Sequence, residues 1–445
     1  MRTGVQTNRK LNTKAILEGG FSYVELPYCM VSETCEGEVY KGKVREEETC
    51  RDEIYIDNVC KNKICEEISG LTVPLAKLTP KLLCEALAAC KACGGSYIAL
   101  ETMNCRAGIL EPIVKECATT LKEYGIPVFL ENGCDGNDAT GYVHGPYSDA
   151  EDLRRIILEC NNICRDAAAT HKNNTDITTE TNAKTTTESG IDITTETNAK
   201  TTTEAGIDII TETDEKNITG TNIDANTKGN AGNIGICYNI GYANLLAQNI
   251  RVQLEQCGDD LQLVHVNDNG GFKNDKQMPY TFTKGRGELT TDWYRIIATL
   301  IRMKYEGWLI FDVEGLFERC PVGLQTQFMQ LLHSLQAEWE NQFSFAKRVL
   351  HQPDKKLILF GAGQMLTDYM RVFGKEYPPS FAVDNNQSRW ETSLCGVSIK
   401  NPTEILKIPK EERNVVICCM FYDAIGVQLR QMGVEYEEFH DRYFV

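Results

Sequence analysis

Three stretches of the chain place polar, reactive side chains directly after runs of β-forming residues. Cys237-Tyr238-Asn239 ends one run, His265-Val266-Asn267-Asp268 ends a second, and Phe311-Asp312-Val313-Glu314 ends a third. Carboxylates, an imidazole, a thiol and amides are groups that bind ligands and move protons. Because the carboxyl ends of parallel strands share one rim of a barrel, we expect these side chains and their loops to converge on a ligand there.

The elements that carry these residues belong to a regular alternation of strands and helices that continues to about residue 340. Helical patterns fill the intervals between strands, as in the segment 110–124, whose apolar residues recur at helical spacing. Eight strand–helix repeats in about 280 ordered residues predict an α/β fold, a (β/α)8 TIM barrel over residues 1–340. The predicted strands are 2–7, 21–26, 71–75, 96–101, 127–131, 234–238, 261–266 and 308–312.

Residues 171–233 interrupt this alternation. They consist of Thr, Asn, Glu, Asp and Lys with almost no large apolar residue, and the sequence that begins at Glu180 is nearly repeated from Glu196, a period of 16. Such a segment cannot offset its ordering entropy by burial, and a barrel loop tolerates it because loop closure costs little more as length grows. We predict a disordered low-complexity repeat insertion. The alternative is a small repetitive β structure built on Ile191, Ile193, Ile207, Ile209 and Ile210.

Composition limits the class of protein. The chain is 42% hydrophobic and 24% charged, its formal net charge is −17, and its 19 cysteines are scattered through predicted helices and strands. We expect no nucleic-acid partner, because phosphate binding depends on Lys and Arg. No apolar run has the length of a membrane helix and the start shows no signal-peptide pattern, so we expect a cytoplasmic protein with no membrane association and with reduced, mostly buried thiols.

A second unit is predicted over residues 353–445. A buried strand, 357–360, leads into the turn Gly361-Ala362-Gly363 and a helix, and a second strand ends at Asp384. This is the opening of a Rossmann-like α/β domain, in which the glycines let the backbone approach a phosphate and the acid meets a ribose hydroxyl. Leu366 holds the third glycine position. The pattern predicts a nucleotide or nucleotide-sugar site at Gly361, Gly363 and Asp384, and the alternative is a strand-to-helix turn that binds nothing.

Five motifs of the first unit occur together and in order. They are Val-Phe-Leu-Glu-Asn-Gly at 128–133, Gly-Ile-Cys-Tyr-Asn-Ile-Gly-Tyr-Ala-Asn-Leu at 235–245, Val-His-Val-Asn-Asp-Asn at 264–269, Gly-Arg-Gly at 285–287 and Tyr-Glu-Gly-Trp-Leu-Ile-Phe-Asp at 305–312. As a set they resemble the xylose isomerase-like TIM barrels, the sugar phosphate isomerase/epimerase family. The second unit more loosely resembles the small Rossmann-like modules of bacterial sugar-modification and polysaccharide-assembly proteins.

The resemblance implies a divalent metal, Mn²⁺, Mg²⁺, Co²⁺ or Zn²⁺, and a small sugar or sugar-phosphate substrate. The implied metal ligands are Glu131, Asn239, His265 and Asp312. Glu131 and Asp312 are also the implied acid and base of a proton transfer through an enediolate. Tyr242, Asp268, Arg286 and Glu101 are the implied substrate-binding residues. Family resemblance also makes a homodimer an expectation, although the sequence leaves the oligomeric state open.

Three positions depart from the family pattern. Asn239 stands where an aspartate is expected, Tyr242 replaces a histidine, and Asp312 replaces a glutamate. Asn brings an oxygen but no charge, and Asp312 sets its carboxylate back by about one methylene, which matters to proton transfer. Moreover, a histidine between two valines on a strand, as His265 is, often has satisfied hydrogen bonds inside the core and binds no metal.

Two functions follow from these observations. The first is a sugar isomerase or epimerase that uses metal-assisted proton transfer. The second is a noncatalytic carbohydrate-binding or glycan-assembly protein with a degenerate metal site. A nuclease on the same barrel is disfavoured, because it would need a His-rich zinc cluster and a basic face, whereas this chain has six histidines and a net charge of −17.

Overall fold

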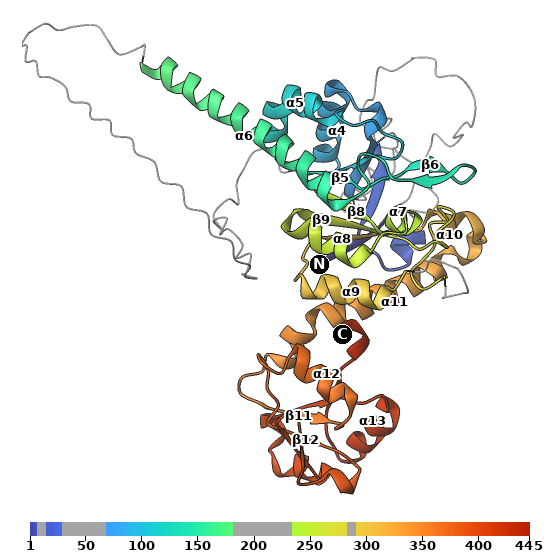
Figure 1. Cartoon of the computed structure of the whole chain (residues 1–445), viewed down its shortest axis with the longest axis vertical. Coiled ribbons are helices and arrows are strands. Elements are labelled where there is room, and N and C mark those ends of the chain that lie inside the picture. The colour runs from blue at the N-terminus through green and yellow to red at the C-terminus, as the bar shows by residue number, and fades with distance from the viewer. Residues whose placement is uncertain (7–14, 29–67, 181–233, 283–290) are drawn as a thin grey trace, which may run out of the picture.

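The computed structural model describes residues 1–6, 15–28, 68–180, 234–282 and 291–445, and of residues 168–180 it describes the backbone alone (Figure 1). Two units are visible: a barrel drawn in blue to yellow, and a smaller domain drawn in orange to red. Within these ranges no helix has the length and apolar composition that crossing a membrane requires. The predicted site residue Arg286 lies outside the described residues, as does the segment 181–233 of the predicted insertion.

Eight strands form a closed barrel in which every neighbouring pair is parallel, in the order β1-β10-β9-β8-β5-β4-β3-β2. The strands are β1 (Arg2–Gln6), β2 (Val24–Pro27), β3 (Ile68–Pro74), β4 (Tyr97–Glu101), β5 (Val128–Glu131), β8 (Ile234–Asn239), β9 (Leu261–Val266) and β10 (Trp308–Asp312). The predicted (β/α)8 barrel is therefore confirmed. All eight predicted strands are present, with ends that shift by at most a few residues.

Helices cover the outside of the barrel because each has one apolar face. In α5 the apolar residues that recur at helical spacing are buried, namely Leu110, Ile113, Val114, Cys117 and Leu121. The helix ends at Gly125, whose φ of 64° suits glycine. The helices are α4 (Pro80–Ala92), α5 (Leu110–Tyr124), α6 (Ala150–Glu180), α7 (Ile240–Leu245), α8 (Ile250–Cys257), α9 (Trp293–Arg302), α10 (Glu314–Arg319) and α11 (Gln325–Phe345). Helix α6 extends away from the barrel in Figure 1 and continues past residue 171, where the insertion was predicted to begin.

Short elements complete the first unit. Strands β6 (Asp135–Asn137) and β7 (Gly141–Val143) form a two-stranded antiparallel sheet beyond the end of β5. Three 3₁₀ turns, η2 (Leu75–Lys77), η3 (Gly258–Asp260) and η4 (Val322–Leu324), connect larger elements. Helix α11 leads into the π-helical turn η5 (Ala346–Leu350), which joins the barrel to the second unit.

The second unit is a six-stranded sheet in the order β13-β14-β12-β11-β15-β16, parallel except for the β13–β14 pair. The strands are β11 (Lys356–Phe360), β12 (Phe381–Val383), β13 (Ser393–Leu394), β14 (Val397–Lys400), β15 (Arg413–Ile417) and β16 (Glu437–Glu438). The helices are α12 (Gln364–Val372) and α13 (Tyr422–Gln431), with 3₁₀ turns η6 (Gln387–Arg389), η7 (Pro402–Lys407), η8 (Lys410–Glu412) and η9 (Asp441–Tyr443). A separate C-terminal sheet domain therefore follows the barrel.

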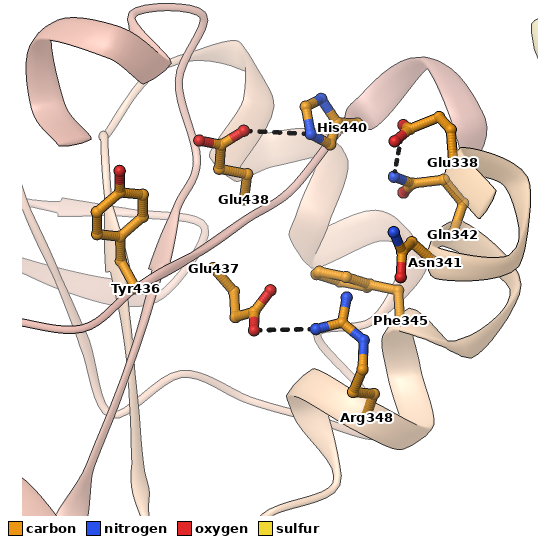
Figure 2. Close-up of a pocket in the computed structure, with 9 residues that line it drawn as sticks. All are labelled: Glu338, Asn341, Gln342, Phe345, Arg348, Tyr436, Glu437, Glu438 and His440. Atoms are coloured by element: carbon orange, nitrogen blue, oxygen red, sulfur yellow. Dashed lines mark hydrogen bonds and ion pairs between the residues drawn. The ribbon is translucent and has the colours of Figure 1, made fainter. Parts of the chain in front are cut away.

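Aromatic side chains pack the two units together. Phe345 of α11 contacts Phe439 and Phe444 near the C-terminus, and Tyr294 of α9 contacts Tyr443. Beside this cluster lies a cavity of about 310 Å³, crossed by the Arg348–Glu437 ion pair (Figure 2). The lining residues of this cavity include none of the predicted site residues.

The inward face of the barrel changes from apolar to polar along each strand. Because side chains alternate, every second residue of a strand faces the interior. The apolar inward cluster contains Tyr97, Ala99, Phe129, Cys237, Leu263, Trp308 and Ile310. Five of the predicted site residues each follow a member of this cluster by two positions on the same strand. They are Glu101 on β4, Glu131 on β5, Asn239 on β8, His265 on β9 and Asp312 on β10. The pleat therefore aims all five predicted residues at the same end of the barrel interior.

Candidate functional site

His265 lies between two buried glutamates. Its Nδ1 is 2.6 Å from Oε1 of Glu131, and its Nε2 is 3.0 Å from Oε1 of Glu25, a close ion pair that lacks hydrogen-bond alignment. The other oxygen of Glu25 accepts a 2.6 Å hydrogen bond from the Tyr97 hydroxyl. All four side chains are almost completely buried.

These contacts determine the charge of His265. Burial by itself would lower the pKa of the imidazole, but Cys237, Glu25 and Glu131 raise it, and the net result is a pKa well above the usual value. His265 is therefore an imidazolium that bridges the two carboxylates, and both of its ring nitrogens have acidic partners.

Asn239 is held by the start of helix α7. As the N-cap residue, its Oδ1 accepts a 3.2 Å hydrogen bond from the backbone N–H of Tyr242 and a 3.0 Å bond from Nδ2 of Asn267. Its Nδ2 donates a 2.9 Å bond to Oε1 of Glu131. Because the cap requires an oxygen on one side, the amide can present only its N–H groups to Glu131.

Lys276 reaches Asp312 from a loop. Its Nζ lies 2.9 Å from Oδ2 of Asp312, which is 2% exposed, whereas the lysine side chain is 25% exposed. Nδ2 of Asn267 lies 3.5 Å from the same oxygen. Burial alone would lower the pKa of Lys276, but attraction to Asp312 outweighs it and the pKa is raised.

An isolated β-bridge between Asp268 and Gln277 fixes the position of Lys276. The backbone of Gln277 exchanges two hydrogen bonds of 2.8 and 2.9 Å with Asp268, and Lys276 adopts a φ of 45°, which is rare for a residue with a side chain. Sequence reasoning missed Lys276 because it lies in a loop without strand or helix periodicity. The loop position itself carried no signal of this contact.

Glu101 lies at the outer edge of the group. Burial, followed by the negative charges of Glu131 and Asp312 and opposed by Lys276, raises the pKa of its carboxyl to about 7. A carboxyl that titrates near neutral pH can act as either acid or base under ordinary conditions.

Two further predicted substrate-binding residues have internal partners. Asp268 is fully buried and accepts hydrogen bonds from Thr291 at 2.7 Å and Trp293 at 3.2 Å, so it anchors the loop that carries Lys276. The hydroxyl of Tyr242 lies 3.9 Å from the sulfur of Met103, and the side chain is 7% exposed. Tyr242 remains at the rim, since Lys276, Glu131 and Asp312 all affect its pKa, which burial raises.

The predicted metal ligands do come together, but their donor set does not fit a divalent cation. Asn239 presents N–H groups to Glu131, His265 has an acidic partner at each nitrogen, and Asp312 binds an ammonium group. A divalent metal needs lone pairs in these positions. The site instead satisfies its carboxylates with cations and amide donors of the chain itself.

A second group of three has ligand atoms within 4.8 Å of one another: Glu131, Cys237 and His265. Proximity therefore permits a metal here. However, burial raises the pKa of the Cys237 thiol to about 12, and the imidazole nitrogens face Glu25 and Glu131. Without a metal the thiol is protonated and the imidazole pairs with two carboxylates, so a metal bound here would have to displace both the thiol proton and these pairs.

The glycine turn of the C-terminal domain comes together with its predicted acid. Gly361 has a φ of 123°, and a Cβ there would lie 2.5 Å from the carbonyl oxygen of Cys418. Gly363 is the N-cap of α12. Oδ2 of Asp384 accepts a 2.9 Å hydrogen bond from the backbone N–H of Ala362 in the turn. A carboxylate of the chain therefore occupies one of the donors that a phosphate would use.

The fold and site together define a (β/α)8 barrel with an acidic, internally paired rim. The chain is similar in structure to a D-psicose 3-epimerase (TM-score 0.42, 10% identity, 76% of this chain and 99% of the other) and to an L-ribulose 3-epimerase (0.43, 9%, 80% and 99%). It is also similar to a xylose isomerase domain protein from Alicyclobacillus acidocaldarius (0.42, 12%, 77% and 99%). No family model and no curated protein matches the sequence.

These neighbours are xylose isomerase-like sugar epimerases and isomerases, the group that the sequence motifs resemble. At such TM-scores and identities the likeness carries no conclusion about activity. The fold is established by the closed parallel barrel itself.

Proposed function

We propose that the barrel is an isomerase or epimerase that transfers a proton on a small sugar or sugar phosphate. The observation that supports this most is a continuous chain of contacts, Glu131–Asn239–Asn267–Asp312, across the carboxyl ends of neighbouring strands. It holds two carboxylates at fixed positions on one rim. Active sites of this barrel architecture lie at that rim.

Proton transfer next to a carbonyl needs a base, a group that returns the proton, and stabilisation of the negative oxygen formed in between. In the proposed reaction Glu131 or Asp312 removes the carbon-bound proton, and the bonding pair moves to the carbonyl oxygen to give an enediolate. In isomerisation the carboxylic acid so formed returns the proton to the neighbouring carbon. In epimerisation the other of the two carboxyl groups, in its acid form, donates a proton from the opposite face. Glu101, which titrates near neutral pH, exchanges protons with the substrate hydroxyls.

The residues predicted as metal ligands take other roles in this scheme. His265 holds Glu131 in place by the 2.6 Å contact, and Asn239 fixes the opposite side of the same carboxylate. Both are therefore positioning residues. Since the donor set does not fit a divalent cation, no step is assigned to one.

One observation favours the second candidate, a noncatalytic carbohydrate-binding or glycan-assembly protein. Glu131 and Asp312 already have cationic partners within the chain, at 2.6 and 2.9 Å. When the charged groups of the rim are paired with one another, they can stabilise the folded state without taking part in catalysis. A sugar could then bind at the outer edge of the rim.

Deuterium exchange distinguishes the two. Aldoses, ketoses and their phosphates are incubated with the protein in D2O, and proton NMR follows the loss of the hydrogen next to the carbonyl. The proposed enzyme exchanges this hydrogen in at least one sugar, and Glu131→Gln and Asp312→Asn each slow the exchange by about 100-fold or more. Asp259→Asn, an exposed carboxylate, is the matched control. Sugar binding without exchange would establish the second candidate, and neither binding nor exchange would exclude both.

For the C-terminal domain we propose a nucleotide or nucleotide-sugar ligand. The arrangement of Gly361, Gly363 and Asp384 supports this, since a glycine turn opens onto a helix and an acid from the neighbouring strand reaches the turn. Binding would exchange the internal Asp384 contact for contacts to the ligand.

A further inference from the structure

Any enediolate formed at the rim needs a positive group beside its oxygen. This requirement rests on the proposed function. The described residues supply two cations in the rim cluster, His265 and Lys276. His265 is 1% exposed and lies between two carboxylates, whereas the side chain of Lys276 is 25% exposed. Lys276 is therefore the cation that an entering ligand can reach.

We propose that the ammonium group of Lys276, held by Asp312, takes the place of the divalent cation expected at this rim, and that the barrel works without a metal. The ammonium is the electrophile that contacts the carbonyl oxygen of the substrate. Asn239 donates a hydrogen bond to Glu131 and so stabilises this carboxylate without a metal.

The first argument is the contact with Asp312. This carboxylate ends β10 and is one of the predicted metal ligands, and its Oδ2 has Nζ of Lys276 at 2.9 Å and Nδ2 of Asn267 at 3.5 Å. Both neighbours are donors. A cation and an amide of the chain thus neutralise and solvate the oxygen that a metal would have bound.

The second argument is the orientation of Asn239. An aspartate there would place a negative oxygen against Glu131, an arrangement that needs a cation between them. The asparagine instead donates from Nδ2 to Glu131 at 2.9 Å, while the N-cap bond to Tyr242 fixes its oxygen on the other side. The amide in place of an acid therefore removes a negative charge that a metal would balance and turns N–H groups toward Glu131.

The third argument is that the residues around Lys276 are closely packed. A Cβ at Gly241 would lie 1.7 Å from Oδ1 of Asn267, and a Cβ at Gly315 would lie 1.8 Å from the carbonyl oxygen of Asp275. Glycines thus let the rim amide and the lysine loop approach the helices closely. Together with the Asp268–Gln277 bridge, they hold the lysine at Asp312.

The chemistry of the step balances without a metal. An N–H of the ammonium donates to the substrate carbonyl oxygen. As a carboxylate takes the carbon-bound proton, the electron pair moves onto that oxygen, and the fixed positive charge stabilises it. Reprotonation of carbon reverses the flow of electrons, and the ammonium ends the cycle unchanged.

Manganese binding tests the proposal independently of any activity. Electron paramagnetic resonance measures free Mn²⁺ in titrations of the full chain up to about 1 mM, a concentration that fills most functional cation sites. The wild type is expected to bind no ion at the rim. The double variant Asn239→Asp/Lys276→Met, which restores an acid and removes the ammonium, is expected to bind one.

Two results would overturn the proposal. One is a bound ion in the wild type that disappears in His265→Ala, because the rim would then be a metal site. The other is a double variant that folds, as judged by circular dichroism, and still binds no ion, because Lys276 and Asn239 would then not be what replaces the metal. The single variant Asn239→Asp, which keeps the N-cap oxygen, serves where the double variant fails to fold, and it should raise Mn²⁺ affinity above that of the wild type.

Kinetics supply the second measurement. With a sugar that undergoes exchange, Lys276→Met is expected to lower kcat by about 100-fold or more with a smaller effect on KM, and Lys276→Arg to restore part of the loss. Lys273→Met, an exposed lysine of the same loop, is the matched control. An unchanged kcat in Lys276→Met would reject the electrophile role. If no sugar exchanges, the proposed function fails, and the manganese result still decides how the rim is built.

Discussion

The barrel rim and the glycine turn of the C-terminal domain both contain a carboxylate that is paired within the chain, but the two carboxylates differ in burial. Each holds a carboxylate where a ligand was predicted, Asp312 at the rim and Asp384 at the turn, and each carboxylate has a partner within the chain. Asp312 is 2% exposed and paired with an ammonium, whereas Asp384 is only partly buried and accepts from a backbone N–H.

Burial decides how firmly each carboxylate is held. Removing one partner of a buried ion pair leaves an uncompensated charge, which costs several kcal/mol, whereas water can replace the partner of an exposed group. The rim is therefore a fixed framework that holds Glu131 and Asp312, with Lys276 and Glu101 at its outer edge. The turn can exchange its internal partner for a ligand.

Removing the imidazolium at the centre of the rim should have the largest effect. His265→Ala leaves Glu25 and Glu131 buried without their shared cation, and we expect a loss of about 3–5 kcal/mol in the free energy of unfolding. Urea denaturation of the full chain measures it. His144→Ala, an exposed histidine, is the control. A loss no greater than that of the control would show that the rim charges do not depend on His265.

The pH dependence of this loss has a definite sign. The folded-state pKa of His265 is raised well above its value in the unfolded chain. The stabilisation is therefore complete below the unfolded value of about 6.5 and disappears only as pH rises through the folded-state pKa. The difference between wild type and His265→Ala should be constant at acidic pH and shrink in the alkaline range.

The fold was predictable because the barrel strands and their covering helices leave strong periodic patterns. The strand ends predicted that Asn239, His265 and Asp312 would share one rim, and the family resemblance added Glu131 and Glu101. The alternation of side chains along each strand explains why all five face the same end of the barrel. Lys276 was missed because its position depends on a two-residue bridge and a positive φ, neither of which leaves a periodic signal.

The role of Asn239 was partly within reach of the sequence. It was predicted as a metal ligand through its oxygen, but an asparagine directly before a helix is also a typical N-cap, and the structure shows that its oxygen serves the cap. The partners of Asp268 could not be predicted, because they lie more than 20 residues further along the chain: Thr291 just before α9 and Trp293 at its first position. Long-range pairs of this kind follow from tertiary packing.

The effect of Glu101 on stability should depend on pH, because this carboxyl group lies at the outer edge of the rim. Its folded-state pKa, about 7, lies above the ordinary value of 4.5. The neutral acid therefore stabilises the protein fully below pH 4.5, and this contribution is lost as pH rises through 7. Relative to the wild type, Glu101→Gln should gain about 3 kcal/mol in stability between pH 4.5 and pH 8.

Denaturation at a series of pH values measures the Glu101 effect, with Glu116→Gln, an exposed glutamate, as the control. A difference between wild type and Glu101→Gln that does not change with pH would place Glu101 in contact with solvent and outside the influence of Glu131 and Asp312.

Asp384 should show the smallest effect on stability and the clearest effect on binding. Asp384→Ala removes two hydrogen bonds, one of 2.9 Å from the N–H of Ala362 in the turn and one of 2.8 Å from the N–H of Asn386. Water can replace both at this partly buried position, so we expect a loss of about 1 kcal/mol. Asp384→Asn keeps an acceptor oxygen and should lose less. Asp354→Ala, at an exposed position, is the control.

Calorimetric titration with UDP-glucose completes the comparison between the rim and the turn. If the turn exchanges its carboxylate contact for a ribose hydroxyl, the wild type binds and Asp384→Ala weakens binding by about 10-fold, the value of one charge-assisted hydrogen bond. Tighter binding in Asp384→Ala would mean instead that the carboxylate competes with a phosphate for the N–H of Ala362. If the wild type does not bind UDP-glucose at about 1 mM, Asp384 has only a structural role. Its internal hydrogen bonding would then be permanent, like that of the ion pairs at the rim.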